Sequence, residues 1–174
     1  YDPTISTWFW SSYDCDEPSG TGGNTSGTGG TTGTSGFAQV VSEAQFNQMF
    51  PDRIPFYTYV DLVAATAKYP AFANTGDLDT RKREAAAFLA NVAQETGHLI
   101  YIDQIVQDVS CQWSSDCPCE AGKKYFGRGP IQITWNYNYC MAGDALGYNL
   151  RQNPELVSQN DEVAWGTGLW FWMT

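Results

Sequence analysis

The sequence predicts a mainly α-helical domain over residues 37–174, preceded by a flexible linker. Three observations lead to this fold class. Apolar side chains recur at helical spacing, capping residues and prolines delimit the segments that carry them, and no alternating stretch is long enough for a large sheet. The chain of 174 residues corresponds to about one domain. Its 43% hydrophobic fraction can build a core, which excludes wholesale disorder.

Residues 19–36 form the predicted linker, because they consist of eight Gly, six Thr, three Ser and one Asn. Such a stretch has no apolar side chain to bury and is expected to behave as a flexible coil. Residues 1–18 are then the end of an upstream module, and their aromatic cluster fits either a carbohydrate-binding module or any other domain. Because the chain begins with Tyr1 and no leader precedes it, we expect a processed or truncated product.

Local signals delimit the first two helices. Ser42 and Gln45 form a capping box for a helix that is expected to end before Pro51. A second helix is expected over about residues 58–69, ended by Pro70.

The strongest helical pattern covers residues 80–96, where Gly97 follows as a C-terminal cap. Residues 105–129 then form a long loop. Three more helices are expected: one over about residues 137–146 that closes on Gly147, one that starts near Asn153 with Pro154 in its first helical position, and an aromatic one over residues 161–174. The tryptophans of this last segment, Trp165, Trp170 and Trp172, are predicted to be core residues.

The charge balance limits the classes of partner. Nineteen acidic residues face nine basic ones, for a net charge of −10, so nucleic acid is not an expected partner. No apolar run approaches the ~18 residues of a membrane span, so we expect no membrane-spanning segment. An uncharged ligand recognised by aromatic rings and hydrogen bonds fits this composition.

Five cysteines favour disulfides in a secreted protein, because three of them fall within nine residues of a polar loop. They form no CxxC pair, and a single histidine is too few for the usual mixed zinc sites, so no metal site is expected. An odd count leaves one thiol free or paired outside the chain, and Cys15 is the candidate because it lies beyond the linker.

Glu95 is the candidate catalytic residue that the pattern itself selects. It lies two helical turns after Phe88, so we expect it on the apolar stripe, where burial and the negative end of the helix dipole raise the pKa of the carboxyl group. A carboxyl that stays protonated near neutral pH suits a general acid. The alternative is a Glu paired with a basic residue in a core cleft.

Five segments together resemble the glycoside hydrolase family 19 chitinases. They are AAAFLANVAQETG at residues 85–97, KYFGRGPIQITWNYNY at 124–139, GDALG at 143–147, NPELV at 153–157 and LWFWMT at 169–174. The resemblance implies a mainly α, lysozyme-like bilobal fold with a sugar cleft. It also implies endo-acting hydrolysis of β-1,4-linked N-acetylglucosamine polymers with inversion, without a metal or organic cofactor. Because family members continue past the last segment, we expect a fold that is incomplete at the C-terminus.

Inversion requires two carboxyl groups about 6.5–9.5 Å apart, one as acid and one as base. The resemblance assigns the acid to Glu95, but a gapless match puts Gln104 at the position of the base, and an amide accepts no proton at ordinary pH. Three explanations stay open. The glutamine was engineered, it is natural and makes an inactive chitin binder, or the match slips by one residue and Asp103 is the base.

The further predicted roles fall mostly on the segment after Gly129. Thr134 matches a hydroxyl that helps to hold the nucleophilic water. The implied substrate-binding residues are Gln132, Tyr137 and Asn138, with Trp135 and Trp113 as further candidates for the cleft. Arg128 is expected to be structural, with its guanidinium holding loop carbonyls or a carboxylate.

The resemblance also implies a disulfide between Cys111 and Cys119, which leaves Cys117 and Cys140 as candidates for a second one. The expected partners are chitin or chitin oligosaccharides, and the expected location is extracellular. A non-enzymatic chitin-binding or extracellular structural protein is the alternative function, and an endolysin acting on peptidoglycan is a third.

Overall fold

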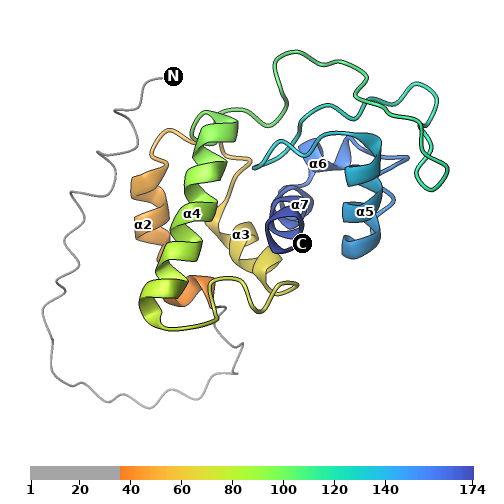
Figure 1. The fold of residues 1–174 in the computed structure, drawn as a ribbon. Helices are drawn as coiled ribbons and strands as arrows, with labels where there is room; N and C mark the ends of the chain where they lie inside the picture. Colours follow the sequence, from red (N-terminus) through yellow and green to blue (C-terminus); the bar gives the residue numbers. More distant parts are fainter. Residues whose placement is uncertain (1–35) are drawn as a thin grey trace, which may run out of the picture. The chain divides into compact units, whose positions relative to one another are not determined.

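The computed structural model describes residues 36–174 (Figure 1), so the predictions for residues 1–18, for nearly all of the linker and for Cys15 lie outside the described residues. The described part contains a 3-10 helix and six α-helices: η1 (Phe37–Gln39), α2 (Glu43–Met49), α3 (Tyr59–Thr66), α4 (Leu78–Thr96), α5 (Asn136–Leu146), α6 (Leu156–Gln159) and α7 (Asp161–Met173). Between residues 36 and 174 the only β pairing consists of isolated bridges that link residue 128 to residues 103 and 133. The mainly α prediction is therefore confirmed.

The predicted capping box of the first helix is present. The hydroxyl of Ser42 accepts from the backbone N–H of Gln45, whose side chain returns a hydrogen bond to the Ser42 backbone. Helix α3 is shorter than expected, because its α-helical bonding stops at Thr66 and the next three residues donate to carbonyls three positions back. This tighter winding precedes Pro70, which disfavours α-helical geometry in the residue before it.

Helices α4 and α5 end as predicted. Gly97 and Gly147 both adopt the left-handed conformation and close the two helices. Helix α4 begins two residues earlier than expected, because Asp77 caps it by accepting from the backbone N–H of Thr80.

The prediction for Pro154 is wrong. Helix α6 starts only at Leu156, because residues 153–155 form a turn in which Pro154 accepts through its carbonyl from the Val157 N–H. Helix α7 matches its predicted range and is capped by Asn160.

Helix α7 joins two hydrophobic cores. Trp165 and Leu169 pack into a core formed with α2, α3 and α4, whereas Val163, Ala164 and Trp170 pack into a second core with α5 and α6. Figure 1 shows α7 between α3 and α4 on one side and α5 on the other. Trp172 is partly buried against the first core, so the prediction of core tryptophans in this helix is confirmed.

The segment between α4 and α5 contains no helix and passes along one end of the domain (Figure 1). Two disulfides, Cys111–Cys119 and Cys117–Cys140, tie it to itself and to α5. The first confirms the predicted pair, and the second joins the two cysteines that the sequence left as candidates. Of the helices between residues 36 and 174, none combines the length and the apolar character that crossing a membrane requires.

Candidate active site

Glu95 lies in the last turn of α4 and is exposed. The expectation that the apolar stripe buries it is wrong. At about 100° per residue, position 95 lies roughly 80° from the centre of that stripe, whose buried members are Ala85, Phe88, Leu89, Val92 and Thr96. Within residues 36–174 no ion pair involves Glu95, so the alternative of a salt-bridged glutamate does not hold either.

The turn after Glu95 is sharply bent. Gly97, His98 and Leu99 all have positive φ angles, of 57°, 63° and 64°. The buried hydroxyl of Thr96 holds the bend, because it donates to the Val92 carbonyl at 2.6 Å and accepts from the Leu99 N–H at 2.7 Å. Positive φ at residues other than glycine is strained and tends to occur at functional sites.

Gln104 is fixed against the opposite segment by a set of hydrogen bonds. Its backbone N–H donates to the Gly127 carbonyl at 2.8 Å, and its side-chain Oε1 accepts from the Gly127 N–H at 2.8 Å. Its Nε2 donates to the Val106 carbonyl. Both ends of the amide are therefore engaged by the backbone.

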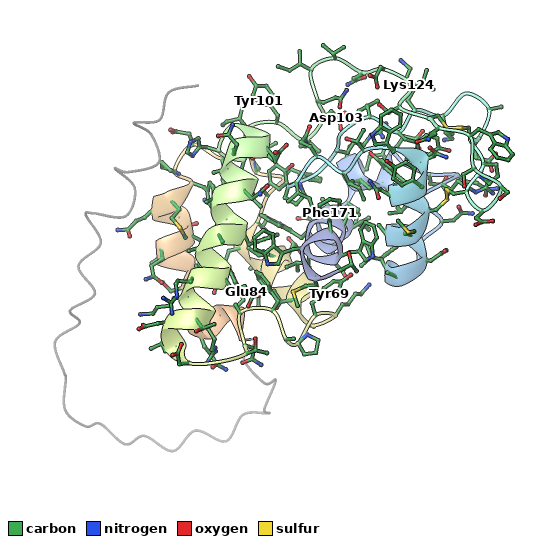
Figure 2. All side chains as sticks on the ribbon, viewed as in Figure 1. Tyr69, Glu84, Tyr101, Asp103, Lys124 and Phe171 are labelled. Carbon is green, nitrogen blue, oxygen red and sulfur yellow. A yellow bond between two sulfur atoms is a disulfide. The ribbon has the colours of Figure 1, made fainter. Side chains whose placement is uncertain are left out.

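Asp103 is half-buried and already partnered. Its Oδ1 lies 3.8 Å from Nε of Arg128 and accepts a hydrogen bond from the hydroxyl of Ser158 in α6. The side chain of Tyr57 lies nearby and donates to the Tyr101 carbonyl, and burial together with the charge of Asp103 raises the pKa of Tyr57 above its ordinary value. Figure 2 shows Asp103 and Tyr101 at the same end of the domain as the C-terminus of α4.

Arg128 is only 5% exposed, and the structure confirms its predicted structural role. Its Nη1 donates to the Lys124 carbonyl at 3.0 Å and to the Tyr139 hydroxyl at 2.9 Å, and its guanidinium carbon lies 3.6 Å from the centre of the Phe126 ring. Burial raises the pKa of Tyr139, and the neighbouring Arg128 partly opposes that rise. The buried cation thus connects Asp103 to the segment that carries the predicted sugar-binding residues.

Three predicted site residues follow each other along that segment. The Nε2 of Gln132 donates to the carbonyls of Ile102 and Gly129 at 2.9 and 3.0 Å. The hydroxyl of Thr134 donates to the Gln132 carbonyl at 2.8 Å, and the Nδ2 of Asn138 donates to the Thr134 carbonyl at 2.8 Å. All three side chains are half-buried, so part of each still faces solvent.

Gly127 lies close to the side chains of both Gln104 and Gln132. A Cβ atom at residue 127 would lie 2.9 Å from Oε1 of Gln104 and 3.1 Å from Oε1 of Gln132, so a larger residue there would displace the ends of these side chains.

Two predicted cleft aromatics form a pair at the start of α5. The rings of Trp135 and Tyr137 are parallel within 3°, with centres 6.5 Å apart. Trp135 has a φ of 78° and is 41% exposed, so its ring has a free surface.

Asn136 lies between these two rings in sequence but is fully buried. Its side chain accepts from the Gln112 N–H and donates to the carbonyls of Gln112 and Cys117. Sequence reasoning missed this residue, as it missed Ser158, because each bonds to partners far along the chain. It also missed Thr96, whose role depends on the left-handed turn that follows it.

The structure thus brings most predicted site residues onto two adjoining segments, 101–106 and 127–138. Glu95 lies at the end of α4, and within residues 36–174 no hydrogen bond joins it to these two segments. The arrangement offers one exposed carboxyl group, several amide and hydroxyl groups and two stacked aromatic rings. Such a set suits an uncharged polar ligand with apolar faces.

Comparisons with known proteins agree with this chemistry. The family model described as chitinase class I, of glycoside hydrolase family 19, matches residues 34–174. Chitinase 1 of Oryza sativa subsp. japonica is 45% identical over 163 residues, covering 80% of this chain and 50% of that protein. The chain therefore spans about half the length of the curated relatives it matches.

Solved structures show the same fold. Chitinase C from Streptomyces griseus HUT6037 superposes with a TM-score of 0.71 at 55% identity, covering 83% of this chain and 68% of the other. A class IV chitinase from Zea mays superposes with a TM-score of 0.74 at 44% identity, covering 78% and 71%. The lysozyme-like fold that the sequence predicts is therefore present.

Proposed function

The chain belongs to the glycoside hydrolase family 19, the class I chitinases, and from this membership we propose that it binds β-1,4-linked N-acetylglucosamine chains at the site described above. In this proposal Glu95 is the general acid of an inverting hydrolysis. Gln104 occupies the position of the general base, so hydrolysis by this chain is slow.

The proposed acid is well placed to meet a ligand. Glu95 is exposed, and the strained turn that Thr96 holds fixes the end of the helix that carries it. Gln132, Tyr137, Asn138 and Trp135 would hold the sugar, and Thr134 would orient the attacking water. Neutral amides and aromatic rings are the groups that an acetylated amino sugar requires.

The observation that carries the proposal of slow hydrolysis is the hydrogen bonding of the Gln104 side chain. Its amide hydrogen-bonds to Gly127 and Val106 and has no basic oxygen with which to activate water. Asp103 is a weaker candidate for the base, because Arg128 and Ser158 already share its carboxylate. A general base contributes about 10²–10⁴-fold to such a reaction.

Restoring the base tests this proposal. Gln104→Glu should raise the turnover of chitin oligosaccharides by about 10²–10⁴-fold and release the α-anomer, seen by NMR at early times. Glu95→Gln should abolish that gain, because the leaving oxygen then receives no proton.

Azide gives a second test that leaves the sequence unchanged. Azide attacks the anomeric carbon without losing a proton, while the glycosidic bond breaks and the Glu95 proton moves to the leaving oxygen. The unaltered chain should therefore form an α-glycosyl azide faster than it hydrolyses the same oligosaccharide.

Two other outcomes would change the assignment. If the unaltered chain matches Gln104→Glu in turnover and Asp103→Asn abolishes that turnover, Asp103 is the base. If the chain and Gln104→Glu both bind chitin oligosaccharides without turnover, and azide has no effect, the domain is a non-enzymatic chitin-binding protein.

The proposed location is extracellular. The two disulfides are typical of an oxidising compartment, and chitin is an extracellular polymer. An upstream carbohydrate-binding module remains part of the proposal for residues 1–18.

A further inference from the structure

Trp113 is the most exposed large apolar side chain between residues 36 and 174, at 86%. An indole ring in water contributes nothing to the hydrophobic stabilisation of the fold. Its neighbours in the same loop, Ile105, Val106 and Val109, are also largely exposed.

The backbone that carries Trp113 is held rigidly. The residue lies inside the loop closed by Cys111 and Cys119, and both backbone groups of the preceding Gln112 are bonded to Asn136, at 2.9 and 2.8 Å. A ring presented on an ordered backbone loses little conformational entropy when a ligand covers it.

The same hydrogen bonds hold the backbone just before Trp113 against the start of α5, where the proposed sugar site lies. Asn136 is flanked in sequence by Trp135 and Tyr137, the stacked pair of that site. Trp113 directly follows Gln112, the residue whose backbone Asn136 binds. Trp113, Trp135 and Tyr137 are therefore each adjacent in sequence to one of the two residues that this double hydrogen bond joins.

The charge of the loop excludes anionic partners. Residues 105–119 contain Asp108 and Asp116 and no Lys or Arg, so nucleic acid and anionic membrane surfaces would be repelled. An uncharged polymer with apolar faces is the occupant that suits both this loop and the adjoining site.

From this juxtaposition we infer that Trp113 is a sugar-stacking position that extends the proposed binding site towards longer chitin chains. The inference rests on the proposed function. A short oligosaccharide occupies the site without reaching Trp113, whereas a long one also covers its ring. Trp113 would thus set a preference for chain length.

The test compares ligands of different length. Affinities for chitin disaccharide and hexasaccharide are measured by calorimetry in the Glu95→Gln background, so that no ligand is consumed. Trp113→Ala should weaken hexasaccharide binding roughly two- to tenfold and leave disaccharide binding unchanged. Trp113→Phe, which keeps an aromatic face, should retain most of the affinity.

Val60→Ala is the matched control, because Val60 is also exposed but lies on α3, and it should change neither affinity. An unchanged thermal midpoint in Trp113→Ala shows that the loop still folds. No loss for the hexasaccharide, or an equal loss at both lengths, overturns the role of Trp113. A parent chain that binds neither ligand overturns the proposed function itself, and the inference with it.

Discussion

In the proposed function, Gln104 keeps the shape of a catalytic carboxyl group without its ability to accept a proton. Its bond from the Gly127 N–H suits either an amide or a carboxylate, but only an amide can donate to the Val106 carbonyl. The local backbone is therefore matched to glutamine. Introducing an ionised Glu at this position removes that hydrogen bond and places a carboxylate oxygen against the Val106 carbonyl, so we expect it to lower the free energy of unfolding by about 1–3 kcal/mol.

A pair of carboxyl groups gives the domain a predictable response to pH. Burial, and then the hydrogen bond and charge of Asp61, raise the pKa of Asp161 above its ordinary value. A raised pKa in the folded state means stability that is present below the unfolded pKa and lost as pH rises through the folded pKa. Asp161→Asn should therefore gain stability relative to the parent as pH rises from about 3 to 7, by at most about 1 kcal/mol.

Urea unfolding at both pH values measures that gain. Asp79→Asn is the matched control, because Asp79 also lies in the first turn of a helix but shares no hydrogen bond with another carboxylate. Equal behaviour of the two variants would refute the coupling between Asp61 and Asp161.

For single residues, the sequence predicted the partners of some side chains well but predicted the burial of Glu95 poorly. Arg128 and the cysteine pairs lie where the motifs implied, because each has a specific partner. The burial of Glu95 was wrongly predicted, because at the flank of a stripe it depends on packing partners that a helical period does not contain.

Among the elements, the two glycine-capped helices allow a matched comparison. Gly97 and Gly147 both have positive φ, so alanine costs about 1 kcal/mol at either position through the backbone. A Cβ at Gly97 would also lie 3.1 Å from the Tyr101 ring, whereas a Cβ at Gly147 would meet no side chain within 4 Å. Gly97→Ala should therefore lose about 1 kcal/mol more than Gly147→Ala in chemical denaturation, and equal losses would show that Tyr101 moves away freely.

Helix ends were predictable where the signal is local. The capping box at Ser42 and the glycines at positions 97 and 147 act on their own helices, and these ends match. The C-terminal end of α3 and the start of α6 differ from the predicted positions, because residues near Pro70 and Pro154 wind into turns that proline tolerates. The path of residues 97–135 depends on long-range hydrogen bonds and was not predictable beyond being a loop.

For the molecule as a whole, the contact between α7 and the site segment is testable. A Cβ at Gly168 would lie 2.9 Å from Cγ of Pro130, a rigid ring two residues after Arg128. Gly168→Ala should lower the free energy of unfolding by about 1–3 kcal/mol and weaken binding of chitin oligosaccharides. Gly166→Ala is the control, because its Cβ meets the flexible end of Leu146 at 3.0 Å and alanine favours a helix.

Unfolding curves and calorimetry on the two variants check this prediction. Equal stability and equal affinity in both would show that α7 does not position the segment at Pro130.

Helix α7 belongs to both hydrophobic cores, and this affects how the domain unfolds. Because α7 supplies Trp165 to the first core and Trp170 to the second, separating the two cores would expose one of these indole rings to solvent. Local fluctuations can release the ends of α2 or the long loop, but we expect the amide protons in the middle of α7 to exchange with solvent only through unfolding of both cores. The two cores should therefore unfold together, with the slowest-exchanging backbone in the helix that they share.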